Sequence, residues 1–199
     1  MSKLPQPKPV ALPHAADAGK LAFTLDEVFT KEECEAMIAE TDRRGYDEAK
    51  INVGNGREVV MKDIRNNDRC LIDDTALAGR IFARVKHTLP KRFKNHTLVS
   101  LNERLRFLRY TPGQKFEPHM DGAYARDNGE MSQLTLQLYL NEGCEGGTTR
   151  FLHWEDETRH VDVVPRTGMV IVFQHDILHS GAEVTSGVKY VMRTDIMYK

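Results

Sequence analysis

The chain has 199 residues, of which 40% are hydrophobic and 29% are charged, a composition that is ordinary for one folded, soluble domain. The formal net charge of −1 excludes a strong overall field that would attract nucleic acid or anionic membranes. The cysteines Cys34, Cys70 and Cys144 are odd in number and widely spaced, which argues against a disulfide framework or a zinc ribbon and favours a reducing compartment.

Residues 1–20 are expected to form an extended arm. Pro5, Pro7, Pro9 and Pro13 stand too close together for a helix. The arm is either a disordered tail or a segment that binds a partner. It lacks the apolar core of a secretory signal, and no apolar run in the chain approaches the length that crosses a bilayer. We therefore expect a cytoplasmic protein with no membrane association.

The first half of the chain predicts two helices. Residues 21–29 predict a short strand and a turn, after which Thr30 and Glu33 form a capping-box pattern. The helix is expected over 31–44 and to end at Gly45. Its apolar face is expected to contain Cys34, Met37, Ile38 and Thr41.

Residues 46–70 are rich in glycine and asparagine and predict a loop with one short strand around Glu58–Lys62. A second helix is expected to begin at Asp73 or Asp74, and Pro90 limits its length. Its apolar face is expected to contain Leu77, Ile81, Val85 and Leu89.

The second half of the chain predicts strands without intervening helices. Short runs rich in Val, Ile, Thr, Tyr and Phe alternate with Gly, Asn and Asp turns. This pattern is typical of an antiparallel sandwich or barrel such as a jelly roll. We expect one α+β domain over 21–199, with helical support over about 21–97 and a β core over about 98–199. The six expected strands lie at 105–110, 134–140, 148–152, 160–164, 168–173 and 189–198.

His119 and Asp121, in the stretch KFEPHMDG, are the first candidate ligands of a metal. Two residues apart on an extended chain, their side chains leave the same face and can converge on one cation. Pro118 and Gly122 indicate a strand end, where a site is accessible. Such a triplet also occurs by chance on protein surfaces, so it does not define a site by itself.

A third ligand is expected from the histidines after the apolar stretch GMVIVF. Because a barrel brings distant strands side by side, either His175 or His179 can reach the first pair. Two imidazoles and one carboxylate with open positions are the arrangement of non-haem iron(II) oxygenases, whereas a structural zinc site has four protein ligands. The remaining histidines are expected in the tail, on the surface or partly satisfied in the core: His14, His87, His96, His153 and His160.

Lys189 and Arg193 place two cations on one face of the last expected strand. Since unpaired charges are rarely buried, one explanation is an anionic ligand inside the barrel. The alternative is an exposed strand face that carries both charges. The pattern alone leaves both open.

Together these residues resemble the prolyl-4-hydroxylase-like branch of the 2-oxoglutarate/iron(II) dioxygenases. The likeness covers roughly residues 104–198 and joins a tyrosine, H-x-D, Y-L-N, G-G-x-T, and a histidine followed ten positions later by a basic residue. The helical half is less diagnostic. The segments that carry the likeness are RYTPGQKFEPHMDG, TLQLYLNEGCEGGTTRF and GMVIVFQHDILHSGAEVTSGVKYVMRTD.

The resemblance implies a double-stranded β-helix (jelly-roll) core with N-terminal supporting helices. It implies that His119, Asp121 and His179 are the catalytic metal ligands. It favours His179 over His175, because a glycine and the later Lys189 follow His179.

The resemblance also implies a pocket for 2-oxoglutarate. Lys189 matches the residue that pairs with the far carboxylate of this co-substrate, and Tyr110 and Tyr139 match residues that line the pocket. Some relatives have arginine in place of the lysine, and Arg193 is close enough to share or take over the role. Further residues on the same face as Tyr139 are Thr135 and Gln137.

The implied activity is hydroxylation of a C–H bond, first of all in a prolyl residue of a protein or peptide, by Fe(II), 2-oxoglutarate and O2, with release of succinate and CO2. Ascorbate is a candidate reductant. One alternative is a dioxygenase of a free amino acid or other small molecule, for which additional buried cations near the iron are expected. Another is a non-catalytic jelly-roll binding module. Nucleic acid is disfavoured as a substrate, because the chain has no basic, aromatic stripe.

Two segments that flank the metal motif in sequence are candidate lids, residues 46–70 and Tyr124–Met131. Arg65 and Arg69 are candidate rim residues for backbone carbonyls or an acidic group. The alternative is that these are solvated loop charges.

Overall fold

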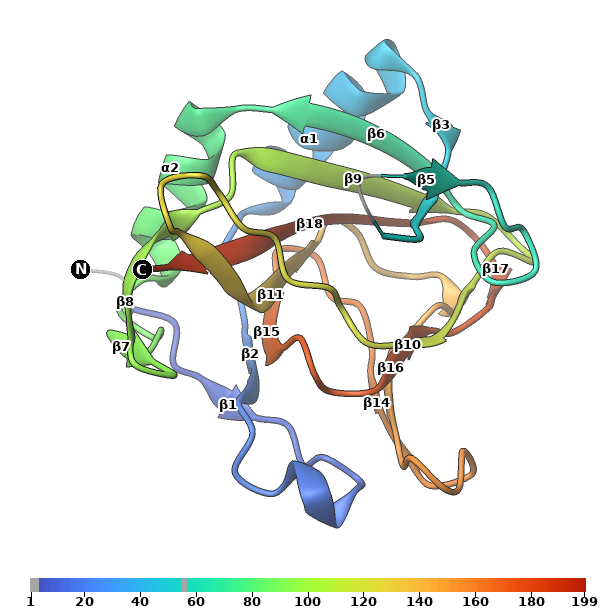
Figure 1. The fold of residues 1–199 in the computed structure, drawn as a ribbon. Helices are drawn as coiled ribbons and strands as arrows, with labels where there is room; N and C mark the ends of the chain where they lie inside the picture. Colours follow the sequence, from blue (N-terminus) through green and yellow to red (C-terminus); the bar gives the residue numbers. More distant parts are fainter. Residues whose placement is uncertain (1–3, 55–56) are drawn as a thin grey trace.

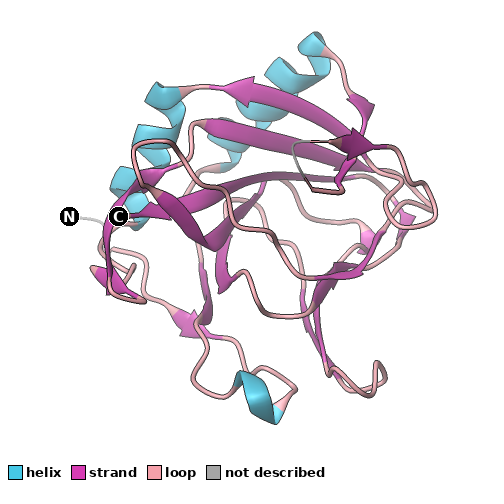
Figure 2. Ribbon diagram, in the orientation of Figure 1, coloured by secondary structure: helices cyan, strands magenta, loops and turns pink. Residues whose placement is uncertain are grey.

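Two antiparallel sheets face each other, and both helices lie on the outer side of the larger sheet (Figure 1). The computed structural model describes residues 4–54 and 57–199. Figure 2 shows how strongly strands predominate over helix. This arrangement is the jelly roll with supporting helices that the sequence predicts.

The larger sheet has the strand order β1-β2-β15-β11-β18-β9-β6-β3, and β8 joins it through β18 and also pairs with β7. Because the chain passes repeatedly from one sheet to the other, residues far apart in sequence face the same interior space. The strands of this sheet are β1 (Lys8–Pro9), β2 (Ala22–Leu25), β3 (Asp47–Glu48), β6 (Asp68–Asp73), β7 (Arg92–Phe93), β8 (His96–Leu101), β9 (Arg104–Tyr110), β11 (Met131–Tyr139), β15 (Val170–Gln174) and β18 (Lys189–Tyr198).

The smaller sheet has the order β10-β16-β13-β14. Two short strand pairs, β12 with β17 and β4 with β5, lie outside both sheets. The bounds are β10 (Phe116–His119), β13 (Thr149–Leu152), β14 (His160–Val163), β16 (His179–Gly181), β12 (Glu145–Gly146), β17 (Val184–Ser186), β4 (Ile51–Asn52) and β5 (Glu58–Val59). All six strands expected in the second half of the chain are present.

Strand β11 shows how one strand serves both the core and the interior space. Leu134, Leu136 and Leu138 are fully buried in the cluster beneath the helices. The intervening side chains leave the opposite face, as the alternation of a strand requires. Tyr139 lies in the cluster between the two sheets, and Thr135 lines the cavity there. The same alternation in β18 directs its cations toward the cavity.

The two helices agree with the sequence in position and capping. Helix α1 (Lys31–Arg44) begins after Thr30, whose side chain accepts from the amide of Glu33 while the Glu33 carboxylate accepts in return. Helix α2 (Thr75–Val85) begins after Asp74, which settles the choice between the two aspartates. The α2 residue Ile81 is fully buried against the large sheet.

The N-terminal arm is extended, but it is not a disordered tail where the structure describes it. Residues 8 and 9 pair with β2 and so add β1 to the edge of the large sheet. A 3-10 turn follows at Ala15–Asp17. The first three residues of the expected arm lie outside the described residues.

The segment 46–70 is more ordered than a loop with one strand. It contains β3, β4 and β5 and the start of β6, and the strand expected around Glu58–Lys62 is limited to β5. Residues 55 and 56 lie outside the described part of the chain. The sequence analysis did not predict β6, because charged residues interrupt the alternation of polar and apolar side chains in this segment. Cys70 and Ile72 are nevertheless buried. No helix in the described ranges is both long and apolar enough to span a bilayer.

Removing the cap of α1 tests this account of local structure. We expect Thr30→Ala to lower the free energy of unfolding by about 1 kcal/mol, because an amide of the first turn loses its acceptor. Thr185→Ala, at an exposed position in β17, is the matched control. Urea unfolding of both variants measures the difference, and equal effects would contradict the capping role.

Candidate metal centre and its pocket

His119, Asp121 and His179 come together at the open end of the two-sheet core. Strands β10 and β16 pair so that His119 stands opposite His179, and Asp121 follows two residues after His119. One ligand atom from each residue can be chosen so that all three atoms lie within 4.8 Å of one another. Neighbouring strands of one sheet therefore supply ligand atoms that are 60 positions apart in the sequence.

Backbone carbonyls orient both imidazoles. The Nδ1 atom of His119 lies 2.7 Å from the carbonyl oxygen of Glu117, and that of His179 lies 2.9 Å from the carbonyl oxygen of Ile177. Because a carbonyl only accepts, each Nδ1 carries the proton and each Nε2 keeps its lone pair for a metal. Burial lowers the pKa of His119 to about 3 and also lowers the pKa of His179. Both rings are therefore neutral at physiological pH.

Asp121 is ionised in spite of its burial. Burial opposes the charge, but the Arg193 guanidinium and the Thr135 hydroxyl outweigh it and hold the pKa of this carboxyl well below its usual range. Arg193 Nη2 lies 2.9 Å from Oδ1, and the Thr135 hydroxyl donates to Oδ2. Two neutral imidazoles and one carboxylate fit a divalent transition metal that keeps positions open for other ligands.

His175 occupies a different position. Its Nε2 lies 3.8 Å from Asp195 Oδ1, and its backbone carbonyl accepts from the amide of Asp121. In the described ranges it does not belong to the group of His119 and Asp121 that can hold a metal.

Lys189 is buried, and no carboxylate in the described ranges forms an ion pair with it. Only 2% of its surface is exposed, so the alternative of an exposed strand face is wrong. Its ammonium lies 5.0 Å from the ring centre of Tyr110 and 5.9 Å from that of Tyr139. No carboxylate or hydrogen-bond acceptor among the described residues pairs with it. Burial lowers its pKa to about 8. Arg193, by contrast, is held by Asp121 and by Asp195, at 3.2 Å.

Thr149 is a site residue that the sequence analysis did not single out. Its hydroxyl oxygen accepts from Tyr139 at 2.6 Å and from Gln137 at 3.0 Å. With both lone pairs occupied, its own hydrogen is available to donate to a ligand in the cavity that it lines. The sequence did contain a signal for this residue, because Thr149 is the threonine of the G-G-x-T stretch.

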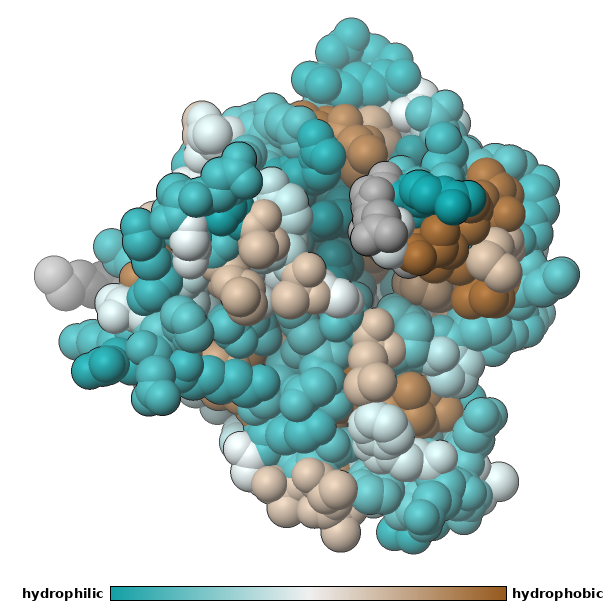
Figure 3. Space-filling model, in the orientation of Figure 1, coloured by the Kyte–Doolittle hydropathy of each residue, from teal (hydrophilic) through white to brown (hydrophobic). Residues whose placement is uncertain are grey.

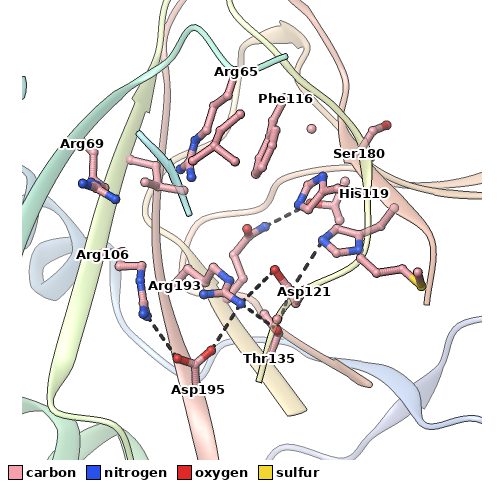
Figure 4. A pocket seen from close by; sticks show the side chains of 18 of the residues that line it. Arg65, Arg69, Arg106, Phe116, His119, Asp121, Thr135, Ser180, Arg193 and Asp195 are labelled. Atoms are coloured by element: carbon pink, nitrogen blue, oxygen red, sulfur yellow. Dashed lines mark hydrogen bonds and ion pairs between the residues drawn. The ribbon is translucent and has the colours of Figure 1, made fainter. Parts of the chain in front are cut away.

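Arginines line one side of the cavity, which has a volume of about 350 Å³. Figure 4 shows Arg69 and Arg106 across the pocket from His119, with Arg65 beside Phe116. Arg65 and Arg69 are each only 9% exposed, so the alternative of solvated loop charges is wrong. Arg106 was not singled out from the sequence.

The expected lids contribute unequally to the pocket. The segment 46–70 supplies several lining residues, among them Lys50 and Ile64. Of the segment Tyr124–Met131, Tyr124 alone is among the lining residues that the structure describes. The wall on that side is formed instead by residues 119–124.

A second cluster lies away from this pocket. His14 was expected in the tail and His153 on the surface or in the core, and their ring centres lie 4.3 Å apart. Together with Glu155 they form another group whose ligand atoms are within 4.8 Å. His153 is also 3.2 Å from the guanidinium of Arg159, whose positive charge disfavours a metal there.

Known proteins are similar to this chain in sequence and in fold. Residues 105–194, which contain all three clustered ligand residues, match the model of the 2OG-Fe(II) oxygenase superfamily. The match covers the part of the chain that holds the candidate metal centre, and the chain is similar to this superfamily there. The matched superfamily implies Fe(II) and 2-oxoglutarate, and the donor set described above fits that metal. The resemblance to the prolyl-4-hydroxylase-like branch is confirmed.

The relatives of this oxygenase domain are prolyl 4-hydroxylases. The chain is 25% identical over 197 residues to probable prolyl 4-hydroxylase 3 of Arabidopsis thaliana, a match that covers 85% of this chain. The chain spans 66% of the length of that relative.

Two solved structures show the fold. A prolyl-4-hydroxylase of Pseudomonas putida is similar with a TM-score of 0.64 and 20% identity, over 92% of this chain and 95% of that one. A prolyl hydroxylase of Trichoplax adhaerens, in complex with a peptide fragment of the hypoxia inducible factor oxygen degradation domain, is similar with a TM-score of 0.69 and 14% identity, over 90% and 84%.

Metal binding tests the assignment of the third ligand. We expect His179→Ala to weaken Mn(II) binding by more than about a hundredfold. Removing a metal ligand should reduce the affinity more than removing a residue that hydrogen-bonds to a ligand. His87→Ala, at an exposed histidine, is the control and should bind as the unmodified protein does. Paramagnetic resonance of free Mn(II) gives the affinities. Normal binding by His179→Ala together with loss in His175→Ala would transfer the role to His175.

Proposed function

We propose that the protein is an Fe(II)- and 2-oxoglutarate-dependent hydroxylase whose first substrate class is a prolyl residue in a protein or peptide. One observation carries the proposal: the cluster of His119, Asp121 and His179 lines the same cavity as the buried Lys189, with which no described carboxylate forms an ion pair. A cluster alone is compatible with many metals. A lone buried cation beside it calls for an anionic co-substrate.

The protein residues bind and orient, and the bound groups supply the oxidation. When Fe(II) is bound, 2-oxoglutarate loses CO2 to give succinate, one oxygen atom of O2 entering succinate and the other the C–H bond of the substrate. His119 and His179 would provide neutral nitrogen ligands, and Asp121 would provide one negative charge.

Lys189 and Thr149 would bind the carboxylate of 2-oxoglutarate that lies away from the metal. Lys189 supplies the charge and Thr149 the hydroxyl hydrogen that no described residue accepts. Tyr139 fixes the Thr149 rotamer through its own hydrogen bond. These directed donors favour a dicarboxylate of one length over a monocarboxylate.

Arg193 would position Asp121 and leave the co-substrate to Lys189. Its guanidinium already pairs with two carboxylates, Asp121 and Asp195, so its charge is compensated. Lys189 lies four residues away on the same strand face, roughly 13 Å along β18. The two cations thus serve opposite ends of the cavity.

A peptide substrate is supported by the relatives and by the rim of the pocket. The Trichoplax adhaerens neighbour is a complex with a peptide. Figure 3 shows hydrophobic residues gathered over the region of β5, where Val60 and Met61 are exposed. Met120 and Tyr124, which line the cavity, are also exposed. Apolar side chains exposed around a cavity are typical of a surface that binds a chain.

A small acid is the second candidate. Buried cations beyond those expected to serve 2-oxoglutarate were the feature expected for such a substrate, and Arg65, Arg69 and Arg106 line the cavity.

Turnover with candidate substrates tests the proposal. We expect protein supplied with Fe(II), 2-oxoglutarate and ascorbate to form succinate, and to form more of it when a proline-containing peptide or small acid is a substrate. Mass spectrometry should find one added oxygen atom in that substrate. His179→Ala should give no succinate, because the metal is lost. Succinate formation that is equal in this variant would contradict the proposed function.

Replacing Lys189 separates its function from its effect on stability. At pH 7 the ammonium is charged and unpaired, so we expect Lys189→Met to raise the free energy of unfolding without ligand by about 1–3 kcal/mol. The same variant should lose the stabilisation that 2-oxoglutarate gives the Mn(II)-loaded protein. Thermal unfolding with and without co-substrate measures both effects. A variant that is still stabilised by 2-oxoglutarate would transfer the role to Arg193.

The pH dependence of co-substrate binding follows from the same lysine. Burial lowers the pKa of Lys189 to about 8, so the ammonium is lost as the pH rises through that value. We expect the dissociation constant of 2-oxoglutarate to rise by up to about tenfold for each pH unit above 8. Lys189→Arg, which stays charged, should lack this rise. Parallel profiles for the two proteins would contradict the assignment.

A further inference from the structure

The cavity holds more positive than negative charge. Six cationic side chains line it, against three carboxylates. A divalent metal and doubly ionised 2-oxoglutarate cancel one another, so binding both leaves this excess unchanged. A partly closed site with uncompensated cations favours a further anion.

Ion pairs account for three of the six cations. Arg69 pairs with Glu58 at 3.0 Å, and Arg106 pairs with Asp195 at 3.1 Å. Arg193 is held by the two aspartates described above. These charges are compensated inside the protein.

Two of the other three cations also have an explanation. Lys50 is exposed and therefore solvated. Lys189 is assigned to 2-oxoglutarate. Arg65 remains, and no carboxylate in the described ranges forms an ion pair with it although it is nine-tenths buried.

Arg65 is firmly positioned beside the metal cluster. Its backbone forms an isolated bridge with Phe116 on β10, the strand that ends at His119. The guanidinium carbon lies 4.5 Å from the ring centre of Phe116. The Phe116 ring also stacks with the imidazole of His119, and the two ring centres are 3.6 Å apart. One aromatic ring therefore separates the charge from a candidate metal ligand.

The terminal nitrogens of Arg65 are available to a ligand. The side-chain hydrogen bond assigned to Arg65 runs from Nε to Asn67 Oδ1, at 2.8 Å. This bond fixes the plane of the guanidinium, and a further side-chain interaction links Arg65 to the Tyr110 hydroxyl. The remaining N–H groups on Nη1 and Nη2 can donate to the oxygens of a carboxylate. In Figure 4 the group lies on the cavity side of Phe116.

We propose that the substrate carries a carboxylate, which binds Arg65 while the C–H bond to be hydroxylated lies at the metal. This inference rests on the proposed function and adds the chemical class of the substrate. The carboxylate is either the free α-carboxylate of a small acid or chain end, or an acidic side chain next to the reacting residue in a peptide.

Binding of matched probes to Co(II)-loaded protein saturated with 2-oxoglutarate tests the inference without turnover. The first pair is N-acetylproline and N-acetylproline amide, which differ in the α-carboxylate. The second pair is N-acetyl-Pro-Glu-amide and N-acetyl-Pro-Gln-amide, which differ in the side chain. We expect the carboxylate member of at least one pair to bind at least about tenfold more tightly by calorimetry, as a charged hydrogen-bonded pair does. The pair that discriminates identifies the source of the carboxylate.

Variants assign this preference to Arg65. Arg65→Met should abolish the difference within the pair, and Arg65→Lys should retain part of it because the charge remains. Arg80→Gln, at an exposed position on α2, removes one positive charge away from the cavity and should keep the full preference. The affinity of Arg65→Met for 2-oxoglutarate should be unchanged, which also shows that the variant is folded.

Three results would overturn the inference. They are equal binding within both pairs, no measurable binding of any carboxylate probe, and weaker 2-oxoglutarate binding by Arg65→Met, which would make Arg65 a co-substrate ligand. Failure of the proposed function is distinguishable, because the unmodified protein would then not bind Co(II) and 2-oxoglutarate at all.

Discussion

The ion pair between Arg193 and Asp121 connects the core of the protein to its candidate metal centre. Arg193 belongs to β18, a central strand of the large sheet, whereas Asp121 lies just beyond the end of β10 in the small sheet. The pair keeps the carboxylate ionised in a buried place and fixes its orientation. Asp195 also forms an ion pair with Arg193, which restricts the movement of the arginine side chain. The geometry of the metal cluster therefore depends on the packing of the whole sheet.

The cavity also contains charges that reduce stability. Lys189 and Arg65 are buried without carboxylate partners in the described ranges, and desolvation lowers the pKa of both. A protein that only had to fold would place apolar residues there. Such cations can be retained where bound ligands supply the missing negative charge, and both of them line one pocket. The free-energy cost of burying an unpaired cation therefore supports a co-substrate at Lys189 and a substrate anion at Arg65.

Strand alternation lets the two-sheet core carry both stability and chemistry. In β11 the leucines pack under the helices, while Thr135 and Gln137 line the cavity and Tyr139 is buried in the cluster between the sheets instead of lining the cavity. In β18, Met192 and Ile196 lie in the same core cluster, while Lys189 and Arg193 face inward. A one-residue shift in register would exchange the two sets and destroy the core and the pocket together.

The sequence by itself determined the local structure and the candidate ligands. The capping box predicted the start of α1, and the strand pattern predicted an antiparallel sandwich or barrel such as a jelly roll. The motifs singled out His119, Asp121 and Lys189. These signals are local in the sequence or follow a short period. Only the tertiary structure decided which charges are paired. It placed His175 beside Asp195, added β1 and β6 to the sheet, and left Arg65 without a carboxylate. Burial and ion pairing depend on contacts between distant segments, which no local pattern records.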